Sequence, residues 1–438
     1  MGPAGVSLRQ ITPIDPVSFA HTLLYNCRTF FTRNISRNNS SLVLALSRAP
    51  RLLFAVTSDL TYDQRMQRIC GSLAAAGYRV QLVGWQRPNS LPLAPDSPYQ
   101  QHRLRGWFQK GKLFYLEYNL RLLLYLLGQR AAAWCACDLD TALPVWLRAR
   151  LGGQPFIYDA HELFTEVPEV VGRPAVQRAW RWVEDFIVPR AQLAYTVGPA
   201  LARLLEKRHG RPFAVVRNIS RLDDEASPLP TPAQPAFDGG YLLYQGMLNV
   251  GRGLEALLDA LPLVPGARLV ICGEGDLSQQ LRARAAGLGL MASGQVEFRG
   301  FVRPAELREI TRRAAVGIML LENSGLSYYY SLANKFFDYL HAGIPQVLID
   351  FPEYRALNDE FDVAELVPDL APATLAAALN RLLTFDAEGG APSRYQHLAA
   401  NCRRARLQLN WQHEEQVLLR LYQEVVPLPV KSRLGKTG

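Results

Sequence analysis

Residues 331–348, SLANKFFDYLHAGIPQVL, place a cation and a carboxylate at the start of an apparent helix. Lys335 and Asp338 are three residues apart, so they lie on the same face of that helix. The Gly-Ile-Pro sequence that follows turns the chain into an apolar run. Backbone N–H groups at a helix N-terminus receive phosphate oxygens well, and Lys335 would add a positive charge. The stretch therefore predicts either a helix that caps itself or a site for a phosphorylated ligand.

The same alternation of helical and apolar stretches runs along most of the chain. RLLFAVTSD at 51–59 is followed by the helical pattern RMQRICGSLAAAGY at 65–78 and then by RVQLVGW at 79–85. Near-continuous apolar strands that alternate with helices are typical of a parallel sheet covered on both faces. The alternation stops where four Pro fall within residues 228–235, and it restarts after residue 240.

This pattern predicts an α/β protein with two Rossmann-like domains that face a cleft, and with a C-terminal helix that packs back across them. At 438 residues the chain is too long for a single hydrophobic core. The expected divisions are a basic extension (1–50), a first Rossmann-like domain (51–225), a Pro-rich linker (226–240), a second Rossmann-like domain (241–395), a helical segment (396–425) and a tail (426–438).

The composition favours a globular protein of the cytoplasm. Apolar residues make up 49% of the chain. The most hydrophobic stretch has only eight uncharged residues, between Arg121 and Arg130, which is far fewer than a helix needs to span a bilayer. The N-terminus has no pattern of a signal peptide. The six Cys are scattered, which indicates reduced thiols. We expect a cytoplasmic protein, with the inner face of the membrane as a second location.

The net charge of +9 is concentrated in two segments. Residues 1–50 hold five Arg and one Asp, and residues 101–130 hold four Arg, two Lys and one Glu. In the second segment the cations alternate with Trp, Phe, Tyr and Leu, which favours a contact with an anionic membrane over a nucleic-acid groove. The alternative is an ordinary amphipathic helix with a solvated basic face. We expect no nucleic-acid partner.

Four stretches of the second half, taken in order, resemble one enzyme family. They are YQGMLNVGRGLEAL (244–257), ICGEGD (271–276), EFRGFV (297–302) and NKFFDYLHAGIPQVL (334–348). The chain resembles retaining glycosyltransferases of the GT-B fold, the glycosyltransferase family 4 (group 1) type. In the first half, YDAHELFTE (158–166) and residues 57–80 are similar to the acceptor-domain motifs of that family. The resemblance implies a nucleotide diphosphate sugar as donor, and no separate cofactor.

The resemblance also implies a role for several residues of the second half. Arg252 and Lys335 would stabilise the leaving diphosphate, with the amide of Asn334 at the helix N-terminus beside them. Asp338 would accept hydrogen bonds from the ribose hydroxyls. The family has Glu at this position and eight residues earlier, where this chain has Tyr330, so Tyr330 would replace a carboxylate that contacts the donor sugar.

Further donor-binding residues are expected in the loops that follow strands. Gly246 would let the backbone approach the ligand closely, and the family's usual second cation is replaced by Met247. The resemblance places the nucleotide base near three residues: Gly273, Phe301 and Val302.

In the first half, His161 ends an apolar strand. A His can stabilise a donor sugar or position a hydroxyl by hydrogen bonding, and Glu162 could orient its ring. Asp59 would lie on the acceptor side. Asp138 and Asp140 could share one face of a strand, but the diphosphate is expected in the second half, so we predict no metal site.

The sequence therefore predicts a metal-independent hexosyltransferase that transfers a sugar with retention to a glycan or lipid-linked acceptor, as in the synthesis of cell-surface polysaccharide or glycolipid. Two alternatives stay open, a nucleotide-sugar epimerase of the same fold and a catalytically silent GT-B scaffold. Neither the base, the sugar nor the acceptor follows from the residues.

Overall fold

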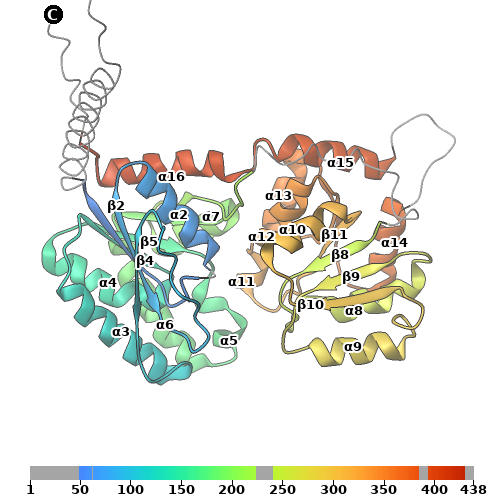
Figure 1. Ribbon diagram of the computed structural model, residues 1–438, viewed down its shortest axis with the longest axis horizontal. Helices are drawn as coiled ribbons and strands as arrows, with labels where there is room; N and C mark the ends of the chain where they lie inside the picture. The colour runs from blue at the N-terminus through green and yellow to red at the C-terminus, as the bar shows by residue number, and fades with distance from the viewer. Residues whose placement is uncertain (1–48, 62, 223–239, 384–392, 430–438) are drawn as a thin grey trace, which may run out of the picture. The chain divides into compact units, whose positions relative to one another are not determined.

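The computed structural model describes residues 49–61, 63–222, 240–383 and 393–429. Residues 51–427 form one compact unit. Most of the expected extension, the linker and the end of the tail lie outside the described residues. The described part therefore holds the whole of both predicted sheets (Figure 1).

The first half contains a seven-stranded parallel sheet in the order β3-β2-β1-β4-β5-β6-β7. Its central strands are buried runs such as RLLFA and FIYDA, which explains why they are mostly apolar; the exceptions are Arg51, half-buried at the start of the first run, and the buried Asp159 in the second. The strands are β1 (Arg51–Ala55), β2 (Arg79–Trp85), β3 (Gln100–Leu104), β4 (Ala133–Cys137), β5 (Phe156–Ala160), β6 (Leu193–Thr196) and β7 (Ala214–Val215).

Helices cover both faces of this sheet (Figure 1). On one face lie α3 (Gly111–Leu127), α4 (Leu139–Gly152), α6 (Pro174–Ile187) and α7 (Pro199–His209), whose apolar side chains share one core cluster, and on the other lie α2 (Gln64–Ala75) and, from the far end of the chain, α16 (Trp411–Val425). Two short elements, η1 (Phe164–Glu166) and α5 (Pro168–Val171), follow β5.

The second half repeats this plan with a six-stranded parallel sheet in the order β10-β9-β8-β11-β12-β13. The strands are β8 (Leu242–Gln245), β9 (Leu269–Cys272), β10 (Val296–Gly300), β11 (Val316–Met319), β12 (Gln346–Ile349) and β13 (Ala364–Val367). The helices are α8 (Leu254–Ala260), α9 (Ser278–Gly287), α10 (Pro304–Arg313), α11 (Leu326–Tyr329), α12 (Asn334–Ala342), α13 (Pro352–Phe361), α14 (Pro372–Leu383) and α15 (Arg394–Ala405). The predicted fold class, two Rossmann-like α/β domains, is confirmed.

The strand orders locate the places where ligands bind. In each sheet the direction in which successive strands are added changes once. The change falls between β1 and β4 in the first half and between β8 and β11 in the second. In open α/β sheets, ligands bind beyond the carboxyl ends of the strands at such a switch point. Thr57, Asp138 and Gly246 follow three of these four strands.

The two halves are joined by buried polar contacts. Glu353 in α13 is fully buried, and its Oε1 accepts hydrogen bonds from the backbone N–H groups of Ala200 and Leu201, at 2.8 and 3.0 Å. These groups open α7 of the first half, where backbone donors have no partner within the helix and the helix dipole favours a carboxylate.

The last helix, α16, packs against the first half. The Trp411 indole donates a hydrogen bond to Ser72 Oγ at 2.9 Å, and the Tyr422 hydroxyl lies 3.2 Å from that of Tyr195. The expectation of a helix that packs back across the domains agrees with these contacts. The helical segment predicted at 396–425 is two helices, α15 and α16.

Candidate active site

The first cluster of predicted site residues follows β8. Gly246 has a φ of 131°, which few residues other than Gly adopt, and a Cβ at this position would lie 3.0 Å from the Nζ of Lys335. A Cβ on Gly273 would overlap the carbonyl oxygen of Gly246. Both glycines are therefore needed for the loops after β8 and β9 to pass beside each other and beside the Lys335 ammonium group.

Lys335 is held close to a second cation. Its Nζ lies 4.1 Å from the centre of the Tyr244 ring, while the guanidinium of Arg252 lies 4.9 Å from the centre of the Tyr328 ring. Burial, and then the repulsion from Arg252, lower the pKa of Lys335 to about 7. The Nε of Arg252 is buried without a hydrogen-bond partner among the described residues. Two cations that destabilise each other are the arrangement expected where an anion binds.

Asp338 lies on the same helix, α12, which begins at Asn334 as predicted. Its carboxylate accepts hydrogen bonds from Gln245 Nε2 at 3.0 Å and from Ser220 Oγ at 3.2 Å. Burial raises the pKa of Asp338 to about 6, and the hydrogen bond from Ser220 acts in the opposite direction. Ser220 belongs to the segment after β7, so Asp338 connects the two halves at the mouth of the site.

A cavity of about 410 Å³ opens beside Asp338. Its lining includes three of the predicted residues, Phe301, Val302 and Asp338, together with Gln245 and Thr311. The Phe301 side chain is 76% exposed, so its ring is available to a flat ligand. The structure thus brings Asp338 and two of the three residues expected near the base to one cavity, whose lining does not include Gly273.

Tyr330 ends α11, and its ring lies 5.1 Å from that of Tyr329. The side chain packs against the hydrophobic core of the first half. The loop that precedes α11 also meets the first half, since a Cβ on Gly325 would lie 3.0 Å from the carbonyl oxygen of Glu166. The segment 325–330 therefore contacts the loop that follows His161.

His161 is the centre of a second cluster, at the carboxyl ends of β4 and β5. Its Nε2 lies 3.1 Å from an oxygen of Asp159, and its Nδ1 lies 3.5 Å from an oxygen of Asp138. Burial would lower the pKa of His161, but Asp159 and Asp138 outweigh it and raise the pKa to about 9. The ring is therefore charged at neutral pH and acts as a hydrogen-bond donor rather than as a base.

Arg65 supports this cluster from α2. Its guanidinium makes two hydrogen bonds to Asp159, at 2.8 and 3.2 Å, and both side chains are buried. Burial would raise the pKa of Asp159, but Arg65 and His161 hold it at about 2. Asp159 is thus a permanently charged residue that orients the His161 ring.

Asp138 supports the ring from the other side. It has a φ of 59°, unusual for a residue other than Gly, and its carboxylate accepts a hydrogen bond from the His161 backbone N–H at 2.8 Å. Asp138 precedes the first turn of α4, which contains Asp140, so the two Asp do not share a strand face as expected. Asp140 accepts a hydrogen bond from Thr57 at 2.6 Å.

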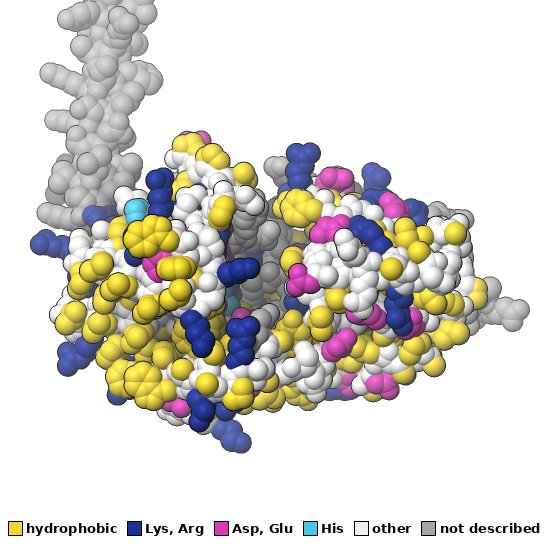
Figure 2. Space-filling view, turned by 90° about the horizontal axis from the view of Figure 1, so that it is seen from below, with side chains coloured by type: hydrophobic (Ala, Val, Ile, Leu, Met, Phe, Trp, Pro, Cys, Tyr) yellow, Lys and Arg dark blue, Asp and Glu magenta, His cyan; other side chains and the backbone are white. Residues whose placement is uncertain are grey.

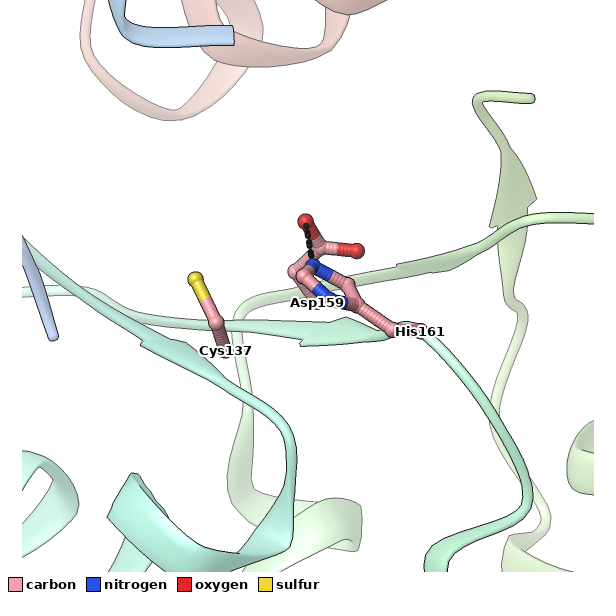
Figure 3. Close-up of side chains that lie close together, drawn as sticks. All are labelled: Cys137, Asp159 and His161. Carbon is pink, nitrogen blue, oxygen red and sulfur yellow. Dashed lines mark hydrogen bonds and ion pairs between the residues drawn. The ribbon is translucent and has the colours of Figure 1, made fainter. Parts of the chain in front are cut away.

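The described residues contain two groups with enough close ligand atoms to hold a metal ion. One is Cys137, Asp159 and His161 (Figure 3). The figure shows the His161 ring turned toward the Asp159 carboxylate, with Cys137 on the neighbouring strand. Burial raises the pKa of the Cys137 thiol, and Arg65 occupies the Asp159 oxygens, so this group is a poor cation site.

The second group is Glu184, Asp185 and His209. Arg208 donates a hydrogen bond to Glu184 at 3.0 Å, so a cation there would be repelled by a guanidinium. Asp138 and Asp140 belong to neither group.

The two predicted acceptor-side residues differ in their surroundings. Asp59 forms an ion pair with Arg103 at 2.8 Å and accepts a hydrogen bond from Ser90 at 2.5 Å. Glu162 is exposed beside His161. Their roles toward an acceptor stay predictions, whereas the residues that the structure places at the His161 ring are Asp159 and Asp138.

Sequence reasoning missed the partners of the site residues. Ser220 and Gln245 hold the predicted Asp338 in place from 118 and 93 positions away along the chain. Arg65 holds Asp159, which orients the predicted His161, from 94 positions away. The sequence did contain a signal for one of these partners. Gln245 is a polar residue at the end of a buried strand, where a polar side chain needs a hydrogen-bond partner.

Comparison with known proteins agrees with this fold. Residues 239–384 match the family described as glycosyl transferases group 1, and residues 62–220 match the glycosyl transferase 4-like domain. No curated protein sequence matches the chain.

Several solved structures share the fold. Sucrose-phosphate synthase from Thermosynechococcus elongatus is 19% identical, with a TM-score of 0.70 over 86% of this chain and 99% of that one. Anabaena HepE in complex with UDP and glucose is 14% identical, with a TM-score of 0.66 over 85% and 98%. WaaG, a glycosyltransferase involved in lipopolysaccharide biosynthesis, is 14% identical, with a TM-score of 0.62 over 86% and 99%.

The fold and the family matches define a glycosyltransferase of the GT-B class. Within that class the chain belongs to the group 1 glycosyltransferases, since the two family matches together cover more than half of its length.

Proposed function

We propose that the protein transfers a hexose, with retention of the anomeric configuration, from a nucleoside diphosphate sugar to a glycan or lipid-linked acceptor. It would act in the cytoplasm, at the inner face of the membrane. The observation that carries the proposal is the pair Arg252 and Lys335, two cations that repel each other, with Lys335 beside Gly246; a bound anion would offset that repulsion.

The diphosphate is the anion that this site suits. When the bond between the anomeric carbon and the donor phosphate breaks, negative charge develops on the leaving oxygen. Lys335, Arg252 and the N-terminus of α12 are fixed positive groups at that place, and such preorganised charges lower the barrier most when charge develops in the transition state. They offset the charge without a metal ion or other cofactor.

The remaining site residues have matching roles in this proposal. The base would stack near Phe301 and Val302, and Asp338 would accept hydrogen bonds from the ribose. The charged His161 would donate a hydrogen bond to the donor sugar from the first half. We propose attack on the same face as the leaving group, assisted by the departing phosphate.

Two of the structural neighbours support the choice of first probes. HepE was solved with UDP-glucose, and WaaG is involved in lipopolysaccharide biosynthesis. UDP-glucose is therefore the first donor to test, with lipid-linked saccharides among the first acceptors.

The test begins with nucleotide binding. Thermal unfolding is measured with UDP, GDP, ADP and CMP, since a ligand at 100 times its Kd stabilises the folded state by about 2.7 kcal/mol. One diphosphate should stabilise the protein more than the others. The matching nucleotide sugar is then supplied without acceptor, and the anomer of the released sugar is followed by NMR before mutarotation. Release of the retained anomer supports the proposal, whereas absence of both binding and release would support a silent scaffold.

A further inference from the structure

The outer face of α3 is apolar and uncovered among the described residues. Its buried face carries Phe114, Tyr118, Leu122 and Leu126. On the opposite face lies a row of five leucines that are 51 to 68% exposed: Leu113, Leu116, Leu120, Leu124 and Leu127. Their spacing of three or four residues places them on one side of the helix. A helix that is hydrophobic on all sides is normally covered on both faces. We therefore infer that this row of leucines binds a partner.

The loop before α3 extends this apolar face. Trp107 is 83% exposed and Phe108 is 40% exposed. Their backbone N–H groups donate hydrogen bonds to Glu117 Oε2, at 2.9 Å each, and Arg121 pairs with the other Glu117 oxygen. The Arg121 guanidinium also lies 4.8 Å from the centre of the Trp107 ring. The indole is therefore fixed in an exposed position.

The surroundings of the leucine row are positively charged. Lys110, Lys112, Arg105 and Arg130 are exposed. Glu117 is the only acidic residue of 101–130, and its carboxylate is already bonded to the loop and to Arg121. Figure 2 shows hydrophobic side chains gathered on the first half with Lys and Arg among them, whereas Asp and Glu are more frequent on the second half.

A hollow of about 920 Å³ lies beside the row. It is lined by three cations, Arg103, Arg105 and Arg121, and by leucines that include Leu91 and Leu124. Arg103 pairs with Asp59 and Arg121 with Glu117, whereas Arg105 is exposed, so an anionic headgroup would meet Arg105 next to apolar side chains.

We propose that the outer face of α3, together with Trp107 and Phe108, docks on the surface of a bilayer that contains anionic lipids. The helix lies in the interface, with its leucines among the acyl chains and the surrounding cations at the headgroups. No helix in the described parts of the chain is long and apolar enough to cross a bilayer. Among the exposed residues of α3 five are leucines and Lys112 alone is charged, so the alternative of a solvated basic face does not describe this helix.

Charge decides between a bilayer and a second copy of the chain. A self-contact through this face would bring the cations that surround the row together, with no free carboxylate of 101–130 to pair with them. An anionic lipid surface complements them. The inference goes beyond the proposed function, because docking requires none of the donor-site residues.

The test is flotation of the full chain with vesicles of phosphatidylcholine, with and without about 30% phosphatidylglycerol. We expect binding to the anionic vesicles at least about tenfold tighter than to the neutral ones, and weaker at high salt. The double variant Leu116→Gln, Leu120→Gln and the double variant Lys110→Glu, Lys112→Glu should each lose about tenfold or more. The matched control Leu288→Gln, Leu407→Gln changes two exposed leucines of the second half and should bind like the wild type.

Thermal unfolding with and without nucleotide shows that each variant is folded and retains its donor site. Equal binding to neutral and anionic vesicles, or unchanged binding in both α3 variants, would overturn the proposal. It would also be overturned by a wild-type dimer that the Leu116→Gln, Leu120→Gln variant converts to a monomer while no vesicle binding is found.

Discussion

Ser220 and Asp338 are joined by a hydrogen bond of 3.2 Å, although 118 residues separate them along the chain. Ser220 belongs to the first half of the molecule, and Asp338 is the carboxylate expected to hold the ribose. A nucleotide that reaches Asp338 must therefore share it with Ser220 or displace the hydroxyl. This contact connects donor binding to the way the two halves meet.

Replacement of Lys335 by Ala should lower kcat/KM by about 10²-fold, because the variant loses a charge that acts most strongly as the diphosphate departs. Replacement of Arg252 by Ala should have an effect of the same size. Steady-state kinetics with the preferred donor measures both. Lys207, which is exposed in α7, supplies the control, and Lys207→Ala should leave kcat/KM unchanged. Wild-type turnover in both site variants would rule out these cations as the group that stabilises the diphosphate.

The affinity for the nucleoside diphosphate should fall as the pH rises above about 7. In the free protein the pKa of Lys335 is lowered to about 7, and a bound diphosphate must raise it again. Binding above pH 7 therefore takes up a proton, and Kd should increase by up to about tenfold for each pH unit. Calorimetric titration between about pH 7.5 and 9 measures the slope, since a diphosphate keeps its full charge there. The Lys335→Arg variant keeps its proton and should lose the slope, and a slope that survives in this variant would assign the proton to another group.

Replacement of Asp159 by Asn should destabilise the fold by about 3 to 5 kcal/mol, because it leaves the buried Arg65 without its anion. The pKa of Asp159 is depressed to about 2 in the folded protein. Its contribution is therefore complete above the ordinary carboxyl pKa of about 4 and is lost as the pH falls toward 2. Urea unfolding at several pH values should show this acid-dependent loss in the wild type and a smaller one in the variant.

The exposed pair Arg284 and Asp259 is the control for that experiment. Asp259→Asn should cost no more than about 1 kcal/mol, as is usual for ion pairs at the surface. Equal effects of the two substitutions would mean that the buried ion pair contributes no more to the free energy of unfolding than the exposed one.

Activity should survive EDTA within about twofold, because fixed cations offset the charge of the diphosphate in the proposed site. Turnover is compared before and after chelation, and again after Mn²⁺ is restored. The decisive result against this expectation is loss of activity in EDTA that Mn²⁺ restores in the wild type but not in Asp140→Asn. That result would assign a metal to the carboxylates after β4.

The fold could be predicted from the sequence because its signal is local. A strand buried on both faces is mostly apolar, and a helix between two such strands carries its own periodic pattern. Residues 51–85 and 331–348 therefore each predict a helix next to a buried strand. The start of α12 at Asn334 could also be predicted from the local sequence.

The surroundings of the site residues could not be predicted, because their partners come from distant segments. His161 was singled out, but its charge depends on Asp138 and Asp159, and the charge of Asp159 depends on Arg65. A spacing argument also misplaced Asp138, because it assumed that a strand continues through 138–140, where the chain already turns into a helix.

The path of α16 has a consequence for how the protein folds during its synthesis. Tyr422 packs 6.0 Å from the ring of Phe54 in β1, and Trp411 is bonded to Ser72, 339 positions earlier. The first sheet therefore emerges from the ribosome long before the helix that completes its cover. Until α16 has left the ribosome, this face of the nascent chain stays exposed, and we expect it to need protection by chaperones during synthesis. A fragment that ends before α16 would keep that vulnerability permanently.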